Sequence, residues 1–148
     1  MNDVELSQTI TNMFKGTDVE HNDYGYFFFY NPDADLPPDH MFPIMTIVTN
    51  DLNDTFSNLE RPDVYRLNIG VSKATFRSLF GEPDEGKQFS GYDYTALDVL
   101  MPHPVYAAQY WVSVINPSDE VFQSKVEPLM DEAYDMAVTK YNKKAAKS

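Results

Sequence analysis

The stretch from Arg61 to Gly81 constrains the fold of this chain more than any other part of the sequence. Between residues 64 and 71, large apolar residues alternate with polar or small ones, which is the period of a strand with one buried face. The two predicted faces carry Tyr65, Leu67, Ile69 and Val71 on the buried side and Arg66, Asn68 and Gly70 on the other. We expect this strand to lie centrally in a sheet, with the rest of the chain built onto it.

A short helix is predicted directly after this strand. Ser72 supplies a side-chain oxygen that can cap the free N–H groups of a first helical turn. Phe76, Leu79 and Phe80 follow at helical spacing, and Gly81 is typical of a helix end. The stretch therefore predicts a strand, a turn and a helix.

The N-terminal third predicts one helix and two strands. A capping-box spacing at Asn2 and a helical apolar stripe indicate a helix that ends at Gly16. We expect residues 17–23 to form a polar loop. The aromatic run 24–30 and residues 42–48 predict strands, joined by a proline-rich hairpin connection at 31–39. The aromatic strand is either covered on both faces or partly open on one.

The remaining segments predict loops at 49–59 and 83–90, a short helix over 95–101 and a last strand over 106–115. Asn116, followed by Pro117, is expected to cap a C-terminal helix. Pro128 predicts a kink in this helix or two abutting helices. We expect residues 143–148 to fray.

This order of elements predicts the α+β class: a mostly antiparallel sheet with N-terminal and C-terminal helices packed on one face. A chain of 148 residues without an internal repeat or linker predicts a single domain, 1–148. The chain has no cysteine, which excludes disulfides, Cys-ligated zinc, iron–sulfur clusters and thiol nucleophiles. We expect a cytoplasmic protein without a signal peptide or membrane span.

The charge balance is acidic. The chain has 11 Lys and Arg against 23 Asp and Glu, a formal net charge of −12. Such a charge repels nucleic-acid phosphates and anionic membranes at long range. Four lysines gather in the C-terminal tail, where they suit the negative end of a helix dipole: Lys140, Lys143, Lys144 and Lys147.

Three blocks of the sequence carry a resemblance: residues 61–81, DYTALDVLMPHPVY at 93–106 and WVSVINPS at 111–118. They resemble the shared blocks of a family of uncharacterised bacterial proteins. Together with the helix LMDEAYDMAVTKYNKK at 129–144, the chain end resembles MmcQ/YjbR-like proteins, which have a frataxin-like (CyaY-like) α+β fold. This resemblance implies a fold, and it raises DNA binding as one hypothesis, although the acidic charge opposes it.

The open face of the central strand is the first candidate site. Arg66 and Asn68 point away from the expected helices, and Trp111 joins them if the last strand buries Val112 and Val114. These side chains can hold an anionic or planar ligand by hydrogen bonds and stacking. The alternative interpretation is a solvated sheet face with a structural Arg–carboxylate pair.

His103 is the second candidate. It lies between Pro102 and Pro104, whose fixed φ angles stiffen the loop. A histidine held in this way can act as a general base or orient a ligand, or it can simply bond the backbone. His103 is thus the candidate catalytic residue and a fourth candidate ligand-binding residue.

No motif in the sequence predicts a metal site or a cofactor. His21, His40 and His103 are scattered, and serine-hydrolase, phosphate-loop and EF-hand patterns are absent. We therefore expect a non-catalytic ligand-binding or interaction module. The alternatives are a small enzyme that uses His103 as acid or base with Arg66 holding an anionic substrate, and a DNA-binding protein. Exposed aromatics in 24–30 would also predict self-association.

Overall fold

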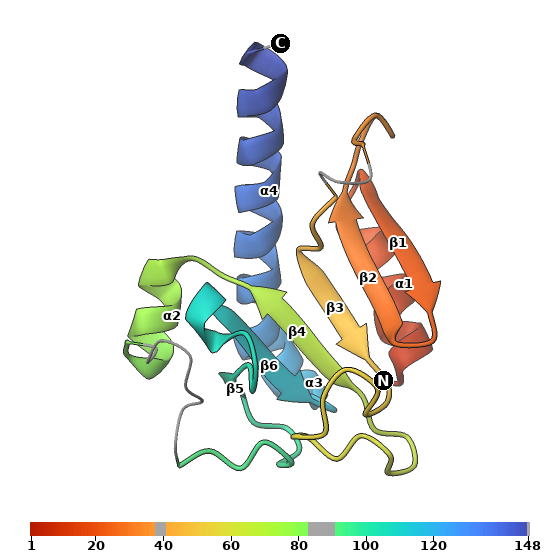
Figure 1. The fold of residues 1–148 in the computed structure, drawn as a ribbon, viewed down its shortest axis with the longest axis vertical. Helices are drawn as coiled ribbons and strands as arrows, with labels where there is room; N and C mark the ends of the chain where they lie inside the picture. The colour runs from red at the N-terminus through yellow and green to blue at the C-terminus, as the bar shows by residue number, and fades with distance from the viewer. Residues whose placement is uncertain (38–40, 83–90, 148) are drawn as a thin grey trace.

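The computed structural model describes residues 1–37, 41–82 and 91–147 of the chain. The strands form one sheet and the helices pack beside it in an α+β arrangement (Figure 1). The elements are α1 (Asp3–Met13), β1 (Thr17–Asn22), β2 (Gly25–Tyr30), β3 (Met45–Val48), β4 (Arg66–Gly70), α2 (Lys73–Phe80), β5 (Met101–Pro102), η2 (Ala107–Gln109), β6 (Trp111–Ile115), α3 (Asp119–Val121), the π-helical turn η3 (Phe122–Val126) and α4 (Glu127–Lys147).

All strand pairs in the sheet are antiparallel, in the order β1-β2-β3-β4-β6-β5. The strand β4 lies inside this sheet, between β3 and β6, as its alternating sequence predicts. Its predicted buried residues all belong to the main core: Tyr65, Leu67, Ile69 and Val71. The predicted α+β class with an antiparallel sheet is confirmed.

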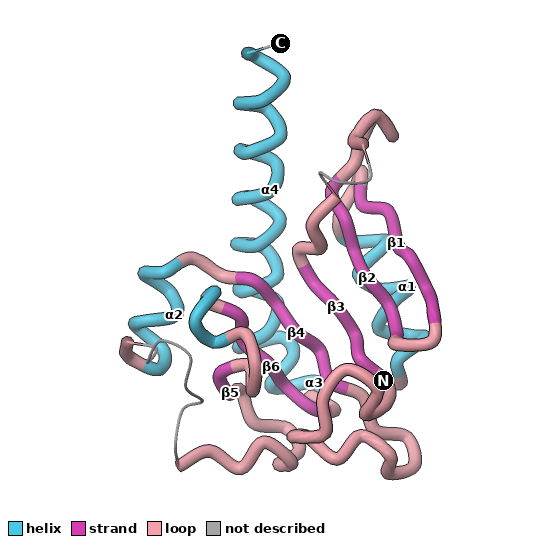
Figure 2. Tube along the Cα trace, viewed as in Figure 1, coloured by secondary structure: helices cyan, strands magenta, loops and turns pink. Residues whose placement is uncertain are grey.

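Helices α1 and α4 lie behind the sheet, and the loop from residue 49 to residue 65 passes in front of it (Figures 1 and 2). The main core fills the space between sheet and helices. Leu6 and Ile10 of α1 and Met130 of α4 belong to this core together with Leu67 and Val114 of the sheet. A smaller apolar cluster on the other face joins Val48, Leu59, Met101 and Ile115. One face of the sheet is thus covered by helices and the other by loops.

The helix α2 matches its prediction. Ser72 is the N-cap and accepts a hydrogen bond from the backbone N–H of Thr75, and Gly81 ends the helix with φ at +86°. Leu79 differs from the expectation because its side chain is exposed, whereas Phe76 is buried. The carboxylate of Glu132 in α4 accepts hydrogen bonds from the hydroxyls of Ser72 and Thr75, which ties α2 to the long helix.

The predicted loop at 17–23 is wrong, because most of it is the edge strand β1. Asn22 pairs with Gly25, so β1 and β2 form a tight hairpin. The sequence of β1 is polar because five of its six residues are exposed. Gly25 is required at this turn: φ is +143°, and a Cβ there would lie 1.9 Å from the carbonyl oxygen of Ile47.

Three further predictions fail in the C-terminal half. The predicted helix over 95–101 is wrong: residues 95–100 form turns and bends, and Met101 belongs to β5. The last strand begins at Trp111 because Tyr110 adopts a left-handed conformation. Ser118, not Asn116, caps the following helix. Asn116 instead accepts a hydrogen bond from the backbone N–H of Tyr65 and donates one to the carbonyl of Asp63.

The C-terminal helix is divided near Pro128, as predicted: η3 precedes α4, which is helical to Lys147. Fraying of residues 143–148 stays a prediction. The loop predicted at 83–90 lies outside the described residues, as does the end of the connection 31–39. Within the described parts of the chain, no helix has the length and apolar character needed to cross a membrane.

Candidate functional site

A cavity of about 640 Å³ lies on the face of the sheet that the helices leave open. Arg66, Asn68, Trp111 and His103 all line it. The sequence places the first three on that face by alternation, and the structure brings His103 to them from the loop after β5. The four residues predicted as a ligand-binding set therefore surround one cavity, although their binding role stays a prediction.

A row of three polar side chains crosses the sheet at the floor of this cavity, and two of them, Thr46 and Asn68, line it. Asn68 on β4 pairs directly with Thr46 on β3 and with Ser113 on β6. The Asn68 amide nitrogen donates to the Thr46 hydroxyl at 2.9 Å, and the Ser113 hydroxyl donates to the Asn68 amide oxygen at 2.7 Å. These bonds fix the amide in one orientation, because its oxygen also accepts from Nε of Arg66 at 2.9 Å.

Arg66 is buried beside this row, with only 1% of its surface exposed. Its guanidinium forms a two-pronged ion pair with Asp54, with Nη1–Oδ1 at 3.1 Å and Nη2–Oδ2 at 2.8 Å. Nη1 also donates to the hydroxyl of Ser57 at 2.8 Å. Burial alone would raise the pKa of Asp54, but the hydrogen bonds and charge of Arg66 outweigh it, so the pKa lies below its usual range.

His103 is also buried, with 3% of its surface exposed. Its backbone N–H donates to the carbonyl of Trp111, which anchors the loop to β6. Its side-chain Nδ1 accepts hydrogen bonds from the backbone N–H groups of Val105 and Tyr106, at 2.9 and 3.0 Å. Burial, followed by the positive charge of Arg66, lowers the pKa of His103 to about 3. The imidazole is therefore neutral at physiological pH.

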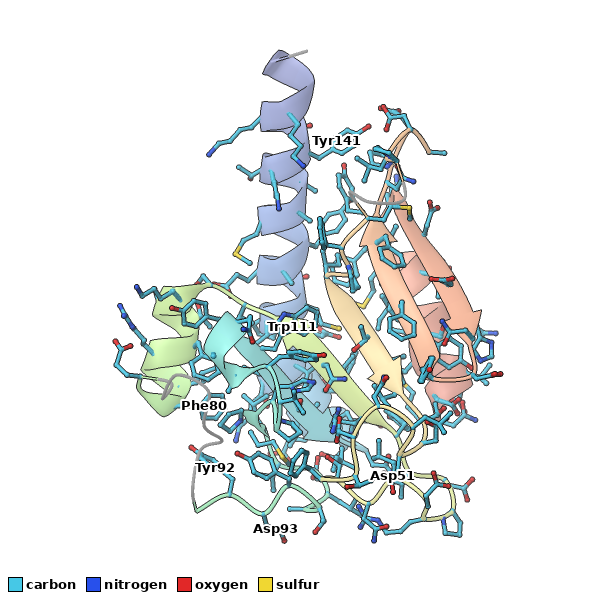
Figure 3. The ribbon with its side chains drawn as sticks, viewed as in Figure 1. Asp51, Phe80, Tyr92, Asp93, Trp111 and Tyr141 are labelled. Carbon is cyan, nitrogen blue, oxygen red and sulfur yellow. The ribbon has the colours of Figure 1, made fainter. Side chains whose placement is uncertain are left out.

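Trp111 is positioned by a glycine on the neighbouring strand. Gly70 pairs directly with Trp111, and a Cβ at Gly70 would lie 3.1 and 3.2 Å from Cε2 and Cζ2 of the indole. The absence of a side chain at Gly70 lets the indole lie close against β4, near the centre of the molecule (Figure 3). The ring is partly exposed and lines the cavity.

Aromatic side chains also form much of the cavity wall: Tyr24, Phe27, Phe42 and Tyr106. Phe42 and Tyr106 are 67% and 54% exposed, so two large rings stand in solvent at the edge of a polar floor. An apolar wall around a few fixed polar groups is typical of small-molecule sites. Strand β2 was expected to be either covered on both faces or partly open on one. The second interpretation agrees with the structure, because Phe27 lines this cavity.

Sequence reasoning missed Asp54, Ser57 and Thr46. The one available signal was indirect: a predicted Arg in a central strand needs a buried counter-charge, and the preceding loop 49–59 is rich in Asp and Asn. The choice of Asp54 among these carboxylates depends on the path of the loop across the sheet, which no local pattern encodes.

The geometry bears on the chemistry that His103 can perform. A general base needs a free lone pair within reach of the proton that it removes. In the neutral ring of His103, Nδ1 accepts two backbone N–H groups, so Nε2 carries the proton. Among the described residues, no hydrogen bond to Nε2 is found. The ring therefore offers a hydrogen-bond donor and not a base.

A second, smaller cavity of about 300 Å³ lies between α4 and residues in the ranges 29–36 and 41–44. Trp111 and Phe42 line both cavities. Tyr141 of α4 closes one side and donates its hydroxyl toward Asp33 and Asp35, at 3.0 and 2.8 Å (Figure 3). A probe that reports on Trp111 must therefore be combined with variants that tell the two cavities apart.

Comparison with protein-family models gives one assignment. The model described as "Family of unknown function (DUF6194)" matches residues 1–146. The chain belongs to this family. No curated protein and no solved structure was found to match the chain. The DUF6194 match includes every residue that lines the cavity on the open sheet face. The family description names no activity. The resemblance to MmcQ/YjbR-like proteins stays a prediction.

Proposed function

We propose that this protein is a non-catalytic binding module that takes a small planar ligand into the cavity on the open sheet face. The observation that carries the proposal is the convergence of Arg66, Asn68, Trp111 and His103 on one cavity. Trp111 supplies a flat surface for stacking, and the polar row beside it supplies hydrogen bonds that orient the ligand.

The state of the polar groups supports binding rather than catalysis. Arg66 is held by Asp54, Ser57 and Asn68, so its position is fixed before a ligand arrives. Preorganisation of this kind lowers the cost of binding. His103 has no lone pair free for proton abstraction, because backbone N–H groups occupy Nδ1.

The enzyme hypothesis keeps one supporting observation, which is that Arg66 and His103 line the same cavity. It requires His103 to exchange a proton near neutral pH, and burial beside Arg66 opposes this. A screen of small metabolites for turnover tests this hypothesis. Turnover that His103→Ala abolishes and His21→Ala leaves intact would replace the binding proposal.

DNA binding follows from the resemblance alone. The net charge of −12 opposes it, and only the C-terminal lysines offer a basic region. Phosphate contacts are strongest at low salt, so a mobility-shift assay at low ionic strength is the sensitive test. We expect no shift.

Fluorescence of the single tryptophan tests the binding proposal directly, because the chain has one Trp and it lines the cavity. We expect some members of a panel of planar aromatic and heteroaromatic compounds to change the emission of Trp111 saturably. Tyr106→Ala, at the edge of the cavity, should weaken such a compound about tenfold, whereas Tyr141→Ala, in the second cavity, should not. If Tyr141→Ala weakens binding and Tyr106→Ala does not, the ligand binds in the second cavity, beside α4.

A further inference from the structure

We propose that His103 is a specificity-determining hydrogen-bond donor, and that the cavity selects uncharged planar ligands that present an acceptor to Nε2–H of His103. This inference rests on the proposed binding function and adds the class of ligand. Three features of the cavity carry it: its charge balance, the tautomer of His103 and the donors left unused on its floor.

The charges that line the cavity cancel. Among the described lining residues, the full charges are those of Asp54 and Arg66, and they are joined in a two-pronged ion pair. The side chains of the two residues are 8% and 1% exposed, so the charges that line the cavity are paired with each other and almost withdrawn from solvent. An anionic ligand would lose its hydration without gaining an unpaired cation, and a cationic ligand would meet no unpaired carboxylate.

The tautomer of His103 follows from its partners. Backbone N–H groups can only donate, so the two that point at Nδ1 require a lone pair on that atom. In a neutral imidazole the proton then belongs to Nε2. Because the ring is nearly buried and lines the cavity, Nε2–H is a donor held in a fixed direction beside the polar floor.

The polar row and the neighbouring indole also carry donors that a ligand can use. The Asn68 amide oxygen already accepts from Arg66 and Ser113. Its amide nitrogen donates one hydrogen to Thr46, and no acceptor for the second hydrogen is found among the described residues. The indole N–H of Trp111 is a donor as well. A ligand whose edge carries carbonyl or ring-nitrogen acceptors satisfies these groups, whereas a ligand whose edge carries only donors leaves them unpaired.

Three isosteric probes separate the charge classes: benzamide, benzoate and benzamidinium at pH 7. They share one planar ring and differ in charge and in acceptor capacity. We expect benzamide to bind at least tenfold more tightly than benzoate or benzamidinium in a titration followed by ¹H–¹⁵N chemical shifts. In parallel, long-range ¹H–¹⁵N spectra of the histidine rings should show the Nε2–H tautomer for His103 from pH 5 to 8.

A variant isolates the donor from the structural role of the ring. In His103→Asn, the side-chain oxygen can take the place of Nδ1 and accept from the backbone N–H groups of Val105 and Tyr106, but no group replaces Nε2–H. We expect this variant to fold and to lose most of the preference for benzamide, about tenfold. His21→Asn, on the exposed strand β1, is the matched control and should bind as the wild type does.

The outcomes are distinguishable. Tight benzoate binding, a protonated His103 ring at neutral pH or an Nδ1–H tautomer would overturn this inference while leaving a binding function in place. Unchanged benzamide preference in His103→Asn would overturn the role of His103 as donor. If none of the three probes perturbs residues around the cavity at millimolar concentration, both the inference and the proposed function fail.

Discussion

The guanidinium of Arg66 and the carboxylate of Asp54 form an ion pair with side chains only 1% and 8% exposed. Arg66 lies in the central strand β4, and Asp54 lies in the loop that crosses the open face of the sheet. The pair therefore holds this loop over the sheet and shapes one wall of the cavity. The structural Arg–carboxylate pair that the sequence offered as an alternative therefore exists, and it lines a cavity rather than a solvated face.

Removing the carboxylate should be costly. Asp54→Asn leaves the Arg66 charge buried without a counter-charge, and breaking a buried pair in this way costs about 3–5 kcal/mol. Asp63→Asn is the matched control, since it makes the same change at an exposed position near the end of the same loop and should cost less than about 0.5 kcal/mol. Urea unfolding of both variants measures the difference. Equal stabilities would show that the ion pair does not anchor the loop.

His103 should make stability depend on pH. Its pKa falls from 6.5 to about 3 on folding, so below pH 6.5 the unfolded chain binds a proton that the folded chain does not. Stability from this residue is complete above pH 6.5 and is lost as pH falls, by about 2 kcal/mol between pH 7 and pH 5. His103→Asn does not titrate there, so its urea midpoint should fall less over this range. Parallel losses in the two proteins would contradict a buried neutral ring.

Two replacements of His103 should differ in stability. His103→Ala leaves the backbone N–H groups of Val105 and Tyr106 without their acceptor. These bonds are partly buried, so the loss costs at most about 1–3 kcal/mol for each group. His103→Asn keeps an acceptor at the position of Nδ1 and should cost less than His103→Ala. Thermal unfolding followed by circular dichroism ranks the two variants. An equal loss in both would mean that Nδ1 does not hold the loop.

Gly70 should control the position of the indole. In Gly70→Ala the new methyl group lies within 3.2 Å of the Trp111 ring, so the ring must shift. We expect altered Trp111 emission and about tenfold weaker binding of a cavity ligand, with stability changed by no more than about 1 kcal/mol. Fluorescence titration and urea unfolding of the same variant supply both values. Unchanged emission and affinity would show that ligand binding does not depend on the position of the indole against β4.

Aromatic rings at the cavity edge bear on the predicted self-association. Tyr24 is 43% exposed and Phe42 is 67% exposed, whereas Tyr26 and Phe28 are buried in the main core. These two exposed rings form a smaller apolar surface than residues 24–30 would form if all of their aromatic side chains were exposed. Light scattering across the micromolar range tests self-association, and Phe42→Ser should lower any dimer fraction that is found.

The sequence predicted the central strand well because a slip of one residue would turn every apolar side chain of β4 to the wrong face. The same alternation placed Arg66 and Asn68 on the open side. Strand β1 was missed because an edge strand with exposed side chains lacks an apolar period, and its pairing with β2 is set by backbone hydrogen bonds. Asp54 was missed for another reason. It reaches the site through the path of its loop across the sheet, and no local sequence pattern encodes that path.

The most direct test of the central claim is a map of backbone and side-chain ¹H–¹⁵N shifts during titration with the best planar compound found by Trp111 fluorescence. A ligand in the proposed cavity should perturb the indole N–H of Trp111, the amide of Asn68 and Nε2–H of His103 together, with one common Kd. Perturbations confined to Lys140, Tyr141 and their neighbours on α4, or no saturable perturbation at all, would contradict the claim that the open sheet face binds the ligand.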